Sequence, residues 1–376
     1  MVAQSLTWSQ VNAWRLSQHG LSPRLERQDF IGAARRTGGI QAQVMSAAEM
    51  AIGARADGLS PKDVQSALWQ ERRLIKTWAM RGTLHLIAAS DLPLYVAARG
   101  MDEVLNWVHY FEYYGITRSQ YEAYLAAAPE IIGSQPMSRE QLATALAERT
   151  GLPELRDLMM TKSWGTPFKP LAERGVLCFG PKDGQNVTFV NPRKWLGEWQ
   201  PVEPQAALQE VARRYLRAYG PAKVEEFAHW WGLRLTPARK LFRSMEGEIE
   251  PVDVEGKPAL ALRETIEPMQ NIVPAGSVNL LPTFDAYEMG LGRGADIEPL
   301  LPRPYQRRVY RPQGWVSAVV LVDGTIQGVW EMKNRRSLTR LKVQMFSPPA
   351  SWVRQGIEAE AERLSAFLNT KVVVEQ

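Results

Sequence analysis

The sequence predicts an α+β protein made of three tandem winged helix-turn-helix modules followed by a C-terminal β-rich α/β domain. Two observations lead to this fold class. The order of expected elements repeats: three times, about three helices precede a two-stranded hairpin, in segments of roughly 60 to 80 residues. Roughly the last hundred residues then read as strands followed by one closing helix. The expected domains are residues 1–100, 101–200 and 201–265 for the modules and 266–376 for the C-terminal domain.

Capping residues mark the expected helix starts. Thr7, Thr117 and Ser138 are each followed by a glutamine three positions later, which is the pattern of a capping box. In a capping box the hydroxyl and the carboxamide each accept a hydrogen bond from the backbone amide of the other residue. Ser60 and Thr236 each precede a proline, which favours a helix that begins at that proline. Helices are therefore expected to begin directly after these five residues.

Each module is expected to end in a hairpin of apolar strands. The paired segments are residues 74–78 with 83–87, 176–179 with 187–190, and 249–254 with 259–262. In the C-terminal domain, Asp323-Gly324 separates strands at 316–322 and 325–332, and this dipeptide favours the two positive φ angles of a tight hairpin turn. Residues 351–368 are expected to form the closing helix.

The composition excludes several classes of protein. Of the 376 residues, 45% are hydrophobic and 23% are charged, which is typical of a globular chain. A single cysteine excludes both an internal disulfide and a multi-cysteine zinc site, and Cys178 is expected in the core because it sits in an apolar strand. The four histidines are far apart in the sequence, and nucleotide-binding, zinc-protease and serine-hydrolase motifs are absent, so neither a metal nor a cofactor is expected. No apolar run approaches about 18 residues and the N-terminus lacks a signal peptide's apolar stretch, which predicts a cytoplasmic protein.

The net charge of +5 is concentrated in one segment. Residues 302–345 hold nine Lys or Arg and two acids, a local charge of +7 that leaves −2 for the rest of the chain. A local basic excess is typical of a surface that meets phosphates, although a solvated face can have the same composition.

The segment from Gly38 to Val44 carries two glutamines in an unusual setting. Gly38 and Gly39 are expected to break the preceding helix, and Gln41 and Gln43 point to the same side if the backbone is extended. Their neighbours Ile40, Ala42 and Val44 then point into the core. The spacing leaves open that both are ordinary loop glutamines with satisfied hydrogen bonds.

With this motif the chain resembles the AlkZ-like group of winged-helix DNA glycosylases. The resemblance rests also on the stretches 80–86, 280–287 and 314–330, and it covers nearly the whole chain. It implies three tandem winged helices with a C-terminal β-rich domain. The implied activity is excision of N7-alkylated purines from double-stranded DNA and, for some members, unhooking of interstrand crosslinks.

The resemblance also assigns residues. The family's two catalytic positions map onto Gln41 and Gln43. Because its motif ends in Gln43 rather than Asp, the chain resembles the branch of the family that includes antibiotic self-resistance enzymes. The middle residue of the family motif is usually a bulky aliphatic, and Ala42 departs from that pattern.

DNA contacts are expected from basic residues and one histidine on the first wing and in the C-terminal basic segment: Arg81, His85, Arg307, Arg308, Lys333, Arg335 and Arg336. His85 alternates with two leucines, so it is expected on the polar face of its strand, with a structural hydrogen bond as the alternative to DNA contact. Asp285 and Tyr287 either orient the site or cap a turn. Trp315 and Trp330 flank the C-terminal hairpin and either pack in the core or stack near DNA.

A second hypothesis is a non-catalytic winged-helix DNA-binding protein, such as a transcription regulator. A regulator needs recognition helices rich in base-reading side chains, whereas residues 154–164 carry mixed charge and only 234–243 is clearly basic. Three modules on one chain also require no dimer, so a monomer is expected, in the cytoplasm and on the nucleoid when bound to DNA. Both points favour the enzyme.

Overall fold

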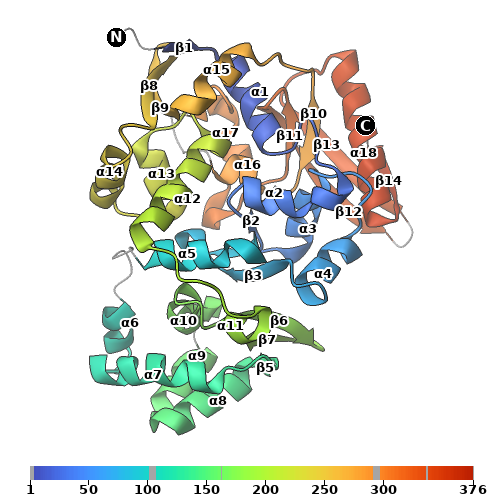
Figure 1. Ribbon diagram of the computed structural model, residues 1–376. Helices are drawn as coiled ribbons and strands as arrows, with labels where there is room; N and C mark the ends of the chain where they lie inside the picture. The colour runs from blue at the N-terminus through green and yellow to red at the C-terminus, as the bar shows by residue number, and fades with distance from the viewer. Residues whose placement is uncertain (1–3, 101–106, 162, 291–296, 336–337, 376) are drawn as a thin grey trace. The chain divides into compact units, whose positions relative to one another are not determined.

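The computed structural model describes residues 4–100, 107–161, 163–290, 297–335 and 338–375 of the chain. Its helices and sheets form two compact units (Figure 1). Unit 1 joins Met1–Gln65 to Ala212–Gln376, and unit 2 is Ser66–Val211. The α+β class is confirmed. The number of winged helices and the bounds of the four expected domains remain predictions.

The N-terminal part of unit 1 is a run of short helices, two of which begin directly after Thr7 and Ser60 as predicted. The Thr7 capping box forms, and the Thr7 amide donates to the Gln10 side chain at 2.9 Å. Asp63 accepts hydrogen bonds from the amide and the hydroxyl of Ser60, both at 2.7 Å, where the fourth helix begins. The elements are β1 (Gln4–Leu6), α1 (Trp8–Gln18), α2 (Ile31–Arg36), β2 (Ile40–Gln41), α3 (Met45–Gly53) and the first residues of α4 (Pro61–Trp69), which continues into unit 2.

A second run of helices in unit 1 ends in the expected hairpin. Strands β8 and β9 pair antiparallel, and β1 joins them in parallel with Leu6 opposite Val254. The expected helix start at Pro237 is wrong, since the helix begins at Leu235. Proline fits anywhere in a first turn, because the amides there have no helical partner. The elements are α12 (Pro204–Tyr219), α13 (Val224–Trp231), α14 (Leu235–Arg243), β8 (Ile249–Val254), β9 (Lys257–Leu262) and α15 (Arg263–Asn271).

The C-terminal part of unit 1 is built on a five-stranded sheet in the order β10-β11-β12-β13-β14. The hairpin at Asp323 and Gly324 is confirmed, with φ angles of 48° and 76°. The closing helix α18 is also confirmed, and Figure 1 shows it in red beside the sheet. The elements are β10 (Val278–Leu281), α16 (Ala286–Met289), α17 (Gln306–Val309), β11 (Val319–Val322), β12 (Thr325–Arg335), β13 (Leu338–Met345), α18 (Ser351–Leu368) and β14 (Lys371–Glu375).

The two faces of this sheet bury different sets of side chains. Val320 and Val322 belong to a cluster with Val353 and Ile357 of α18. The alternate positions of β11 face the other way, as the period of a strand requires. They join what we call the inner cluster, whose buried members are Leu16, Leu21, Leu281, Phe284, Tyr287, Ile297, Leu300, Leu301, Val309, Val316, Val319, Leu321 and Ile326.

Unit 2 contains the other two expected hairpins. They form as β3 with β4 and as β6 with β7, and β5 adds to the second. The capping boxes at Thr117 and Ser138 are confirmed, as is the core position of Cys178, where burial raises the pKa of the thiol. The elements are β3 (Leu74–Trp78), β4 (Leu84–Ala88), α5 (Leu92–Arg99), α6 (Trp107–Tyr113), α7 (Arg118–Ile131), β5 (Met137–Ser138), α8 (Arg139–Thr150), α9 (Pro153–Thr161), α10 (Lys169–Glu173), β6 (Cys178–Asp183), β7 (Asn186–Val190) and α11 (Pro192–Leu196).

Candidate active site

Two hydrogen bonds of Thr37 fix the turn that leads into the glutamine motif. Its hydroxyl donates to the Ala33 carbonyl at 2.7 Å, and its own carbonyl accepts from the Tyr219 hydroxyl at 2.8 Å. Gly38 and Gly39 follow with φ angles of 72° and 124°, which side chains other than glycine rarely adopt. The expected break after α2 is confirmed, and the chain enters the motif from a fixed point.

The two glutamines of the motif differ in exposure, and the apolar residues around them pack inward. Ile40 and Ala42 are fully buried, as expected for side chains that point into the core. Gln43 is half-buried, whereas Gln41 is only 8% exposed. Gln41 is thus more enclosed than expected for a side chain displayed on the surface. Val44 packs against the inner cluster and precedes α3, with its carbonyl accepting from the Ala48 amide at 3.1 Å. The two glutamines therefore lie between a fixed turn and the start of a packed helix.

Arg55, just beyond the end of α3, forms a fully buried ion pair with Asp285. The guanidinium donates to the two carboxylate oxygens at 2.7 and 2.8 Å, and also to the Ala51 carbonyl at 2.8 Å. Asp285 in addition caps α16, since its carboxylate accepts from the Tyr287 amide at 2.8 Å. Of the two roles expected for Asp285, capping a turn is thus observed, and the same side chain also anchors the helix that follows the motif.

Tyr287 supports the same region from the sheet side. Its hydroxyl donates to the Gly324 carbonyl at 3.0 Å. The buried His19 ring lies edge-on to Tyr287 and Tyr219, at 5.1 and 4.9 Å between ring centroids. Burial, followed by the nearby charges of Arg55 and Arg15, holds the pKa of His19 well below its usual value, so this imidazole is neutral and part of the packing.

Glu288 is a buried acid near this cluster. Burial, followed by the charge of Asp285, holds the pKa of its carboxyl well above its usual range. Neither carboxyl oxygen has a hydrogen-bond partner among the described residues. Glu288 is therefore a neutral group in the interior.

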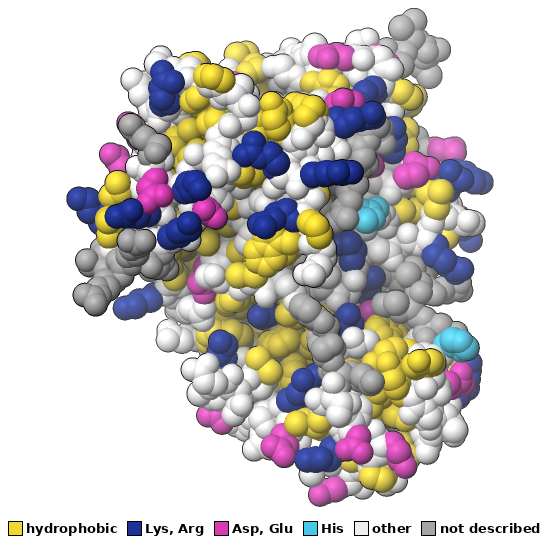
Figure 2. All heavy atoms as spheres, turned by 180° about the vertical axis from the view of Figure 1, so that it is seen from behind, with side chains coloured by type: hydrophobic (Ala, Val, Ile, Leu, Met, Phe, Trp, Pro, Cys, Tyr) yellow, Lys and Arg dark blue, Asp and Glu magenta, His cyan; other side chains and the backbone are white. Residues whose placement is uncertain are grey.

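The expected DNA contacts in the C-terminal basic segment lie on the surface where they are described. Arg307 and Arg308 are exposed on α17, and Arg308 donates to the Gln344 side chain at 3.1 Å. Lys333 is exposed on β12, 3.6 Å from Glu331. The side chain of Arg335 and the whole of Arg336 lie outside the described residues. On the face drawn in Figure 2, basic side chains are interspersed with acidic ones.

The first wing carries the other two expected contacts. Arg81 is half-buried with a φ of 57°. The expectation that His85 lies on a polar face is wrong, because β4 is buried along most of its length and His85 is only 2% exposed. Its Nδ1 lies 2.9 Å from the Thr83 carbonyl, and burial, followed by Arg81, lowers the pKa of His85 to about 3. These facts favour the structural hydrogen bond over a DNA contact.

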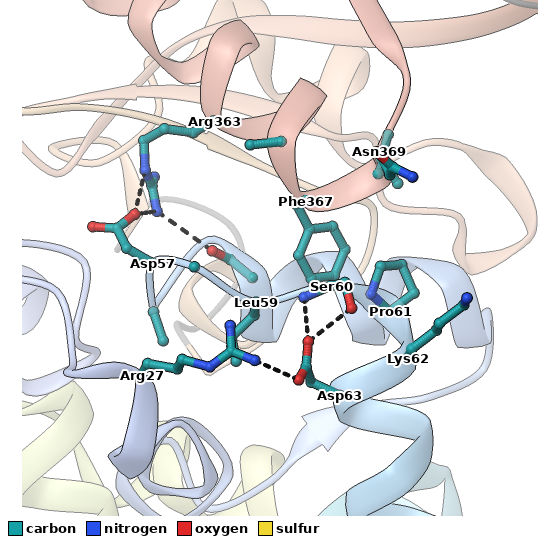
Figure 3. Close-up of a pocket in the computed structure, with 15 residues that line it drawn as sticks. Arg27, Asp57, Leu59, Ser60, Pro61, Lys62, Asp63, Arg363, Phe367 and Asn369 are labelled. Atoms are coloured by element: carbon teal, nitrogen blue, oxygen red, sulfur yellow. Dashed lines mark hydrogen bonds and ion pairs between the residues drawn. The ribbon is translucent and has the colours of Figure 1, made fainter.

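A separate hollow of about 760 Å³ lies in unit 1 between the start of α4 and the end of α18 (Figure 3). Neither motif glutamine lines it. Four of its charged side chains form ion pairs, Arg27 with Asp63 at 2.7 Å and Arg363 with Asp57, and Lys62 also lines it. The hollow is therefore separate from the motif, which remains the candidate site.

Sequence reasoning missed the residues that hold the motif in place. Arg55, Tyr219 and His19 occur in stretches without a recognisable pattern, and their partners are distant in the chain. Within the described residues, no group of three His, Cys, Asp or Glu side chains could hold a metal ion, and no helix is long and apolar enough to cross a membrane.

The chain belongs to the AlkZ-like family of DNA glycosylases. The family described as "DNA glycosylase AlkZ-like" matches residues 34–367. The interstrand DNA cross-link repair glycosylase of Streptomyces sahachiroi is 36% identical over 368 residues, which is 96% of each chain. The solved structure of Streptomyces sahachiroi DNA glycosylase AlkZ superposes with a TM-score of 0.86 at 32% identity, covering 99% of this chain and 100% of the other.

The protein is therefore a DNA glycosylase. The expected resemblance and the enzyme class are confirmed, and the family does not support the alternative of a non-catalytic transcription regulator.

Proposed function

We propose that this DNA glycosylase hydrolyses the N-glycosidic bond of N7-alkylated purines in double-stranded DNA, with Gln41 and Gln43 as its catalytic residues. One observation carries the proposal: the two glutamines are held between the Thr37–Tyr219 contact and helix α3, in a family whose members are DNA glycosylases. A rigid pair of carboxamides is the kind of group this substrate class needs.

The charge of the substrate explains why neutral side chains suffice. An N7-alkylated purine already carries a positive charge, so its glycosidic bond needs little protonation to break. The enzyme must then stabilise an oxocarbenium-like sugar and position a water molecule. A Gln carbonyl accepts a hydrogen bond from that water and faces the developing cation, while the amide group donates to a neighbour.

The same argument sets the limits of the activity. A carboxamide is not a base, so a neutral lesion such as uracil is expected to be a poor substrate. No lysine is assigned to the site, so the enzyme is monofunctional and forms no Schiff base. The protein acts as a monomer, in the cytoplasm and on the nucleoid when it is bound to DNA.

Crosslink repair is the finer part of the proposal. The relative from Streptomyces sahachiroi is described as an interstrand DNA cross-link repair glycosylase, and the two chains match over 96% of their lengths. We assign the same unhooking reaction to this chain. Because the motif ends in Gln43 rather than Asp, we also assign it to self-resistance against a DNA-alkylating natural product.

The test uses duplex DNA that carries a single 7-methylguanine. The wild type should produce alkali-labile abasic sites, and Gln41→Ala and Gln43→Ala should each lower the single-turnover rate about 10²–10³-fold. Gln355→Ala, at an exposed position of α18, is the matched control and should cleave like the wild type. No cleavage by the wild type, or equal cleavage by the double glutamine variant, would refute the assignment.

Two further substrates test the finer parts. A duplex joined through the N7 atoms of two guanines should be unhooked, and a uracil-containing duplex should remain intact. Binding to one DNA sequence without any cleavage would instead support the regulator alternative.

A further inference from the structure

We propose that Trp315 is a nucleobase-stacking residue of the DNA-binding surface. The choice of DNA as the ligand rests on the proposed function, whereas the choice of this residue rests on the loop that carries it and on the charge around it.

The loop from Arg311 to Trp315 is short, closed and exposed throughout. An antiparallel bridge between Tyr310 and Val316 closes its base. Inside it, the Arg311 amide donates to the Trp315 carbonyl at 2.8 Å. Its tip turns at Gln313 and Gly314, with φ angles of 62° and 75°. All five loop residues are exposed, so the loop displays its side chains on a fixed backbone.

The Trp315 indole is partly exposed and is contacted by one other aromatic ring. It is 43% exposed, close to the 42% of Trp352 on α18. Phe284 contacts it edge-to-face, with 5.1 Å between ring centroids and 69° between ring planes. Phe284 itself has a φ of 60°, a strained conformation for a residue with a side chain, and such strain occurs preferentially at functional sites.

Trp330, at the other end of the same hairpin, shows what a structural tryptophan looks like in this fold. It is buried, and its indole nitrogen donates to the Val319 carbonyl at 3.1 Å. Of the two tryptophans considered for stacking, Trp315 is therefore the one that is available.

The segment that carries Trp315 is basic, which favours a polyanionic partner with aromatic bases, such as DNA. Residues 299–322 contain no Asp or Glu. Four arginines in this segment have exposed side chains: Arg303, Arg307, Arg308 and Arg311. Arginines next to an exposed aromatic ring are how proteins hold nucleic acid, since the cations meet phosphates and every base offers a face to stack on.

The loop and the catalytic motif are attached to the same core. Phe284, which contacts Trp315, and Val316, which follows it in the sequence, are both members of the inner cluster. Val44, which follows Gln43 directly, packs against that cluster. DNA held by the loop is thus held by the unit that carries the glutamines.

The experiment compares Trp315→Ala, Trp315→Phe and Trp352→Ala, using a fluorescently labelled duplex with one 7-methylguanine. Trp352 on α18 is 42% exposed and serves as the matched control. Trp315→Ala should raise the dissociation constant about tenfold, in line with the loss of one base stack. Trp315→Phe should retain most of the affinity, and Trp352→Ala should bind like the wild type. All three should unfold at the wild-type temperature.

Equal dissociation constants for Trp315→Ala and the wild type would overturn the proposal, as would equal losses for Trp315→Ala and Trp352→Ala. Binding is measured without turnover, so its outcome is separate from that of the proposed function. A protein that fails to cleave 7-methylguanine but loses affinity only with Trp315→Ala would refute the assigned substrate and retain the stacking residue.

Discussion

Replacing Asp285 with asparagine is expected to destabilise unit 1 by about 3–5 kcal/mol, the usual cost of leaving one buried charge without its partner. Arg55 and Asp285 are both fully buried, and two contacts of 2.7 and 2.8 Å join them. Asparagine keeps the size of the side chain and one acceptor for the Tyr287 amide. It removes the negative charge, so the Arg55 guanidinium would stay charged in the interior without compensation.

Two further variants separate this effect from others. Replacing both partners, Arg55→Met with Asp285→Leu, leaves no buried charge and should cost less than Asp285→Asn, with about 1 kcal/mol remaining from the missing cap of α16. Glu225→Gln breaks the exposed pair with Arg239, 3.0 Å apart in the same unit, and should cost less than about 1 kcal/mol.

The assays are urea unfolding at pH 7 and hydrogen exchange of the α3 amides. For Asp285→Asn we expect a lower midpoint at unchanged slope, together with faster exchange in α3, since Arg55 anchors its end. If Asp285→Asn shifts the midpoint no more than Glu225→Gln does, the buried pair does not hold the helix that follows the motif.

The same region and helix α17 support three other predictions. Tyr219→Phe removes the hydrogen-bond donor to the Thr37 carbonyl, so it should cost about 1 kcal/mol of stability and lower the single-turnover rate, while the enzyme concentration at half-saturation stays the same. An unchanged rate would show that the turn before the motif needs no such support. Glu288 is protonated in the folded protein because its pKa is raised, so the stability of the wild type should fall as the pH rises above the unfolded pKa of about 4.3. Glu288→Gln should remove this dependence of stability on pH. If the unfolding temperatures of the wild type and the variant change in parallel from pH 5 to pH 8, the prediction is wrong. Replacing Arg307 and Arg308 with alanine should lower the slope of log Kd against log salt concentration by about 0.9 for each phosphate that the protein no longer neutralises. An unaltered slope would show that neither arginine contacts DNA.

Local features of the fold could be predicted from the sequence because their causes are local. The capping boxes at Thr7, Thr117 and Ser138 each need residues only three positions apart. The turn at Asp323-Gly324 depends on two adjacent residues, and the closing helix 351–368 on the pattern within it. In each case the residues that decide the conformation are neighbours in the chain.

The support of the candidate site could not be predicted in this way. Arg55 and Asp285 are 230 positions apart, and Tyr219 and Thr37 are 182 apart. An arginine in an unremarkable stretch gives no sign that a distant carboxylate will neutralise it. His85 shows a different failure, since alternation with leucines indicates a polar face only when one side of the strand meets solvent.

The discontinuity of unit 1 has a consequence during synthesis. Arg55 leaves the ribosome 230 residues ahead of Asp285, a delay of roughly ten to fifty seconds at ordinary elongation rates. During that interval Arg55 lacks its carboxylate partner and α3 lacks its contacts with α18, and the whole of unit 2 is made before Asp285 and α18. A fragment that ends near residue 65 should therefore not fold when it is expressed without the C-terminal half.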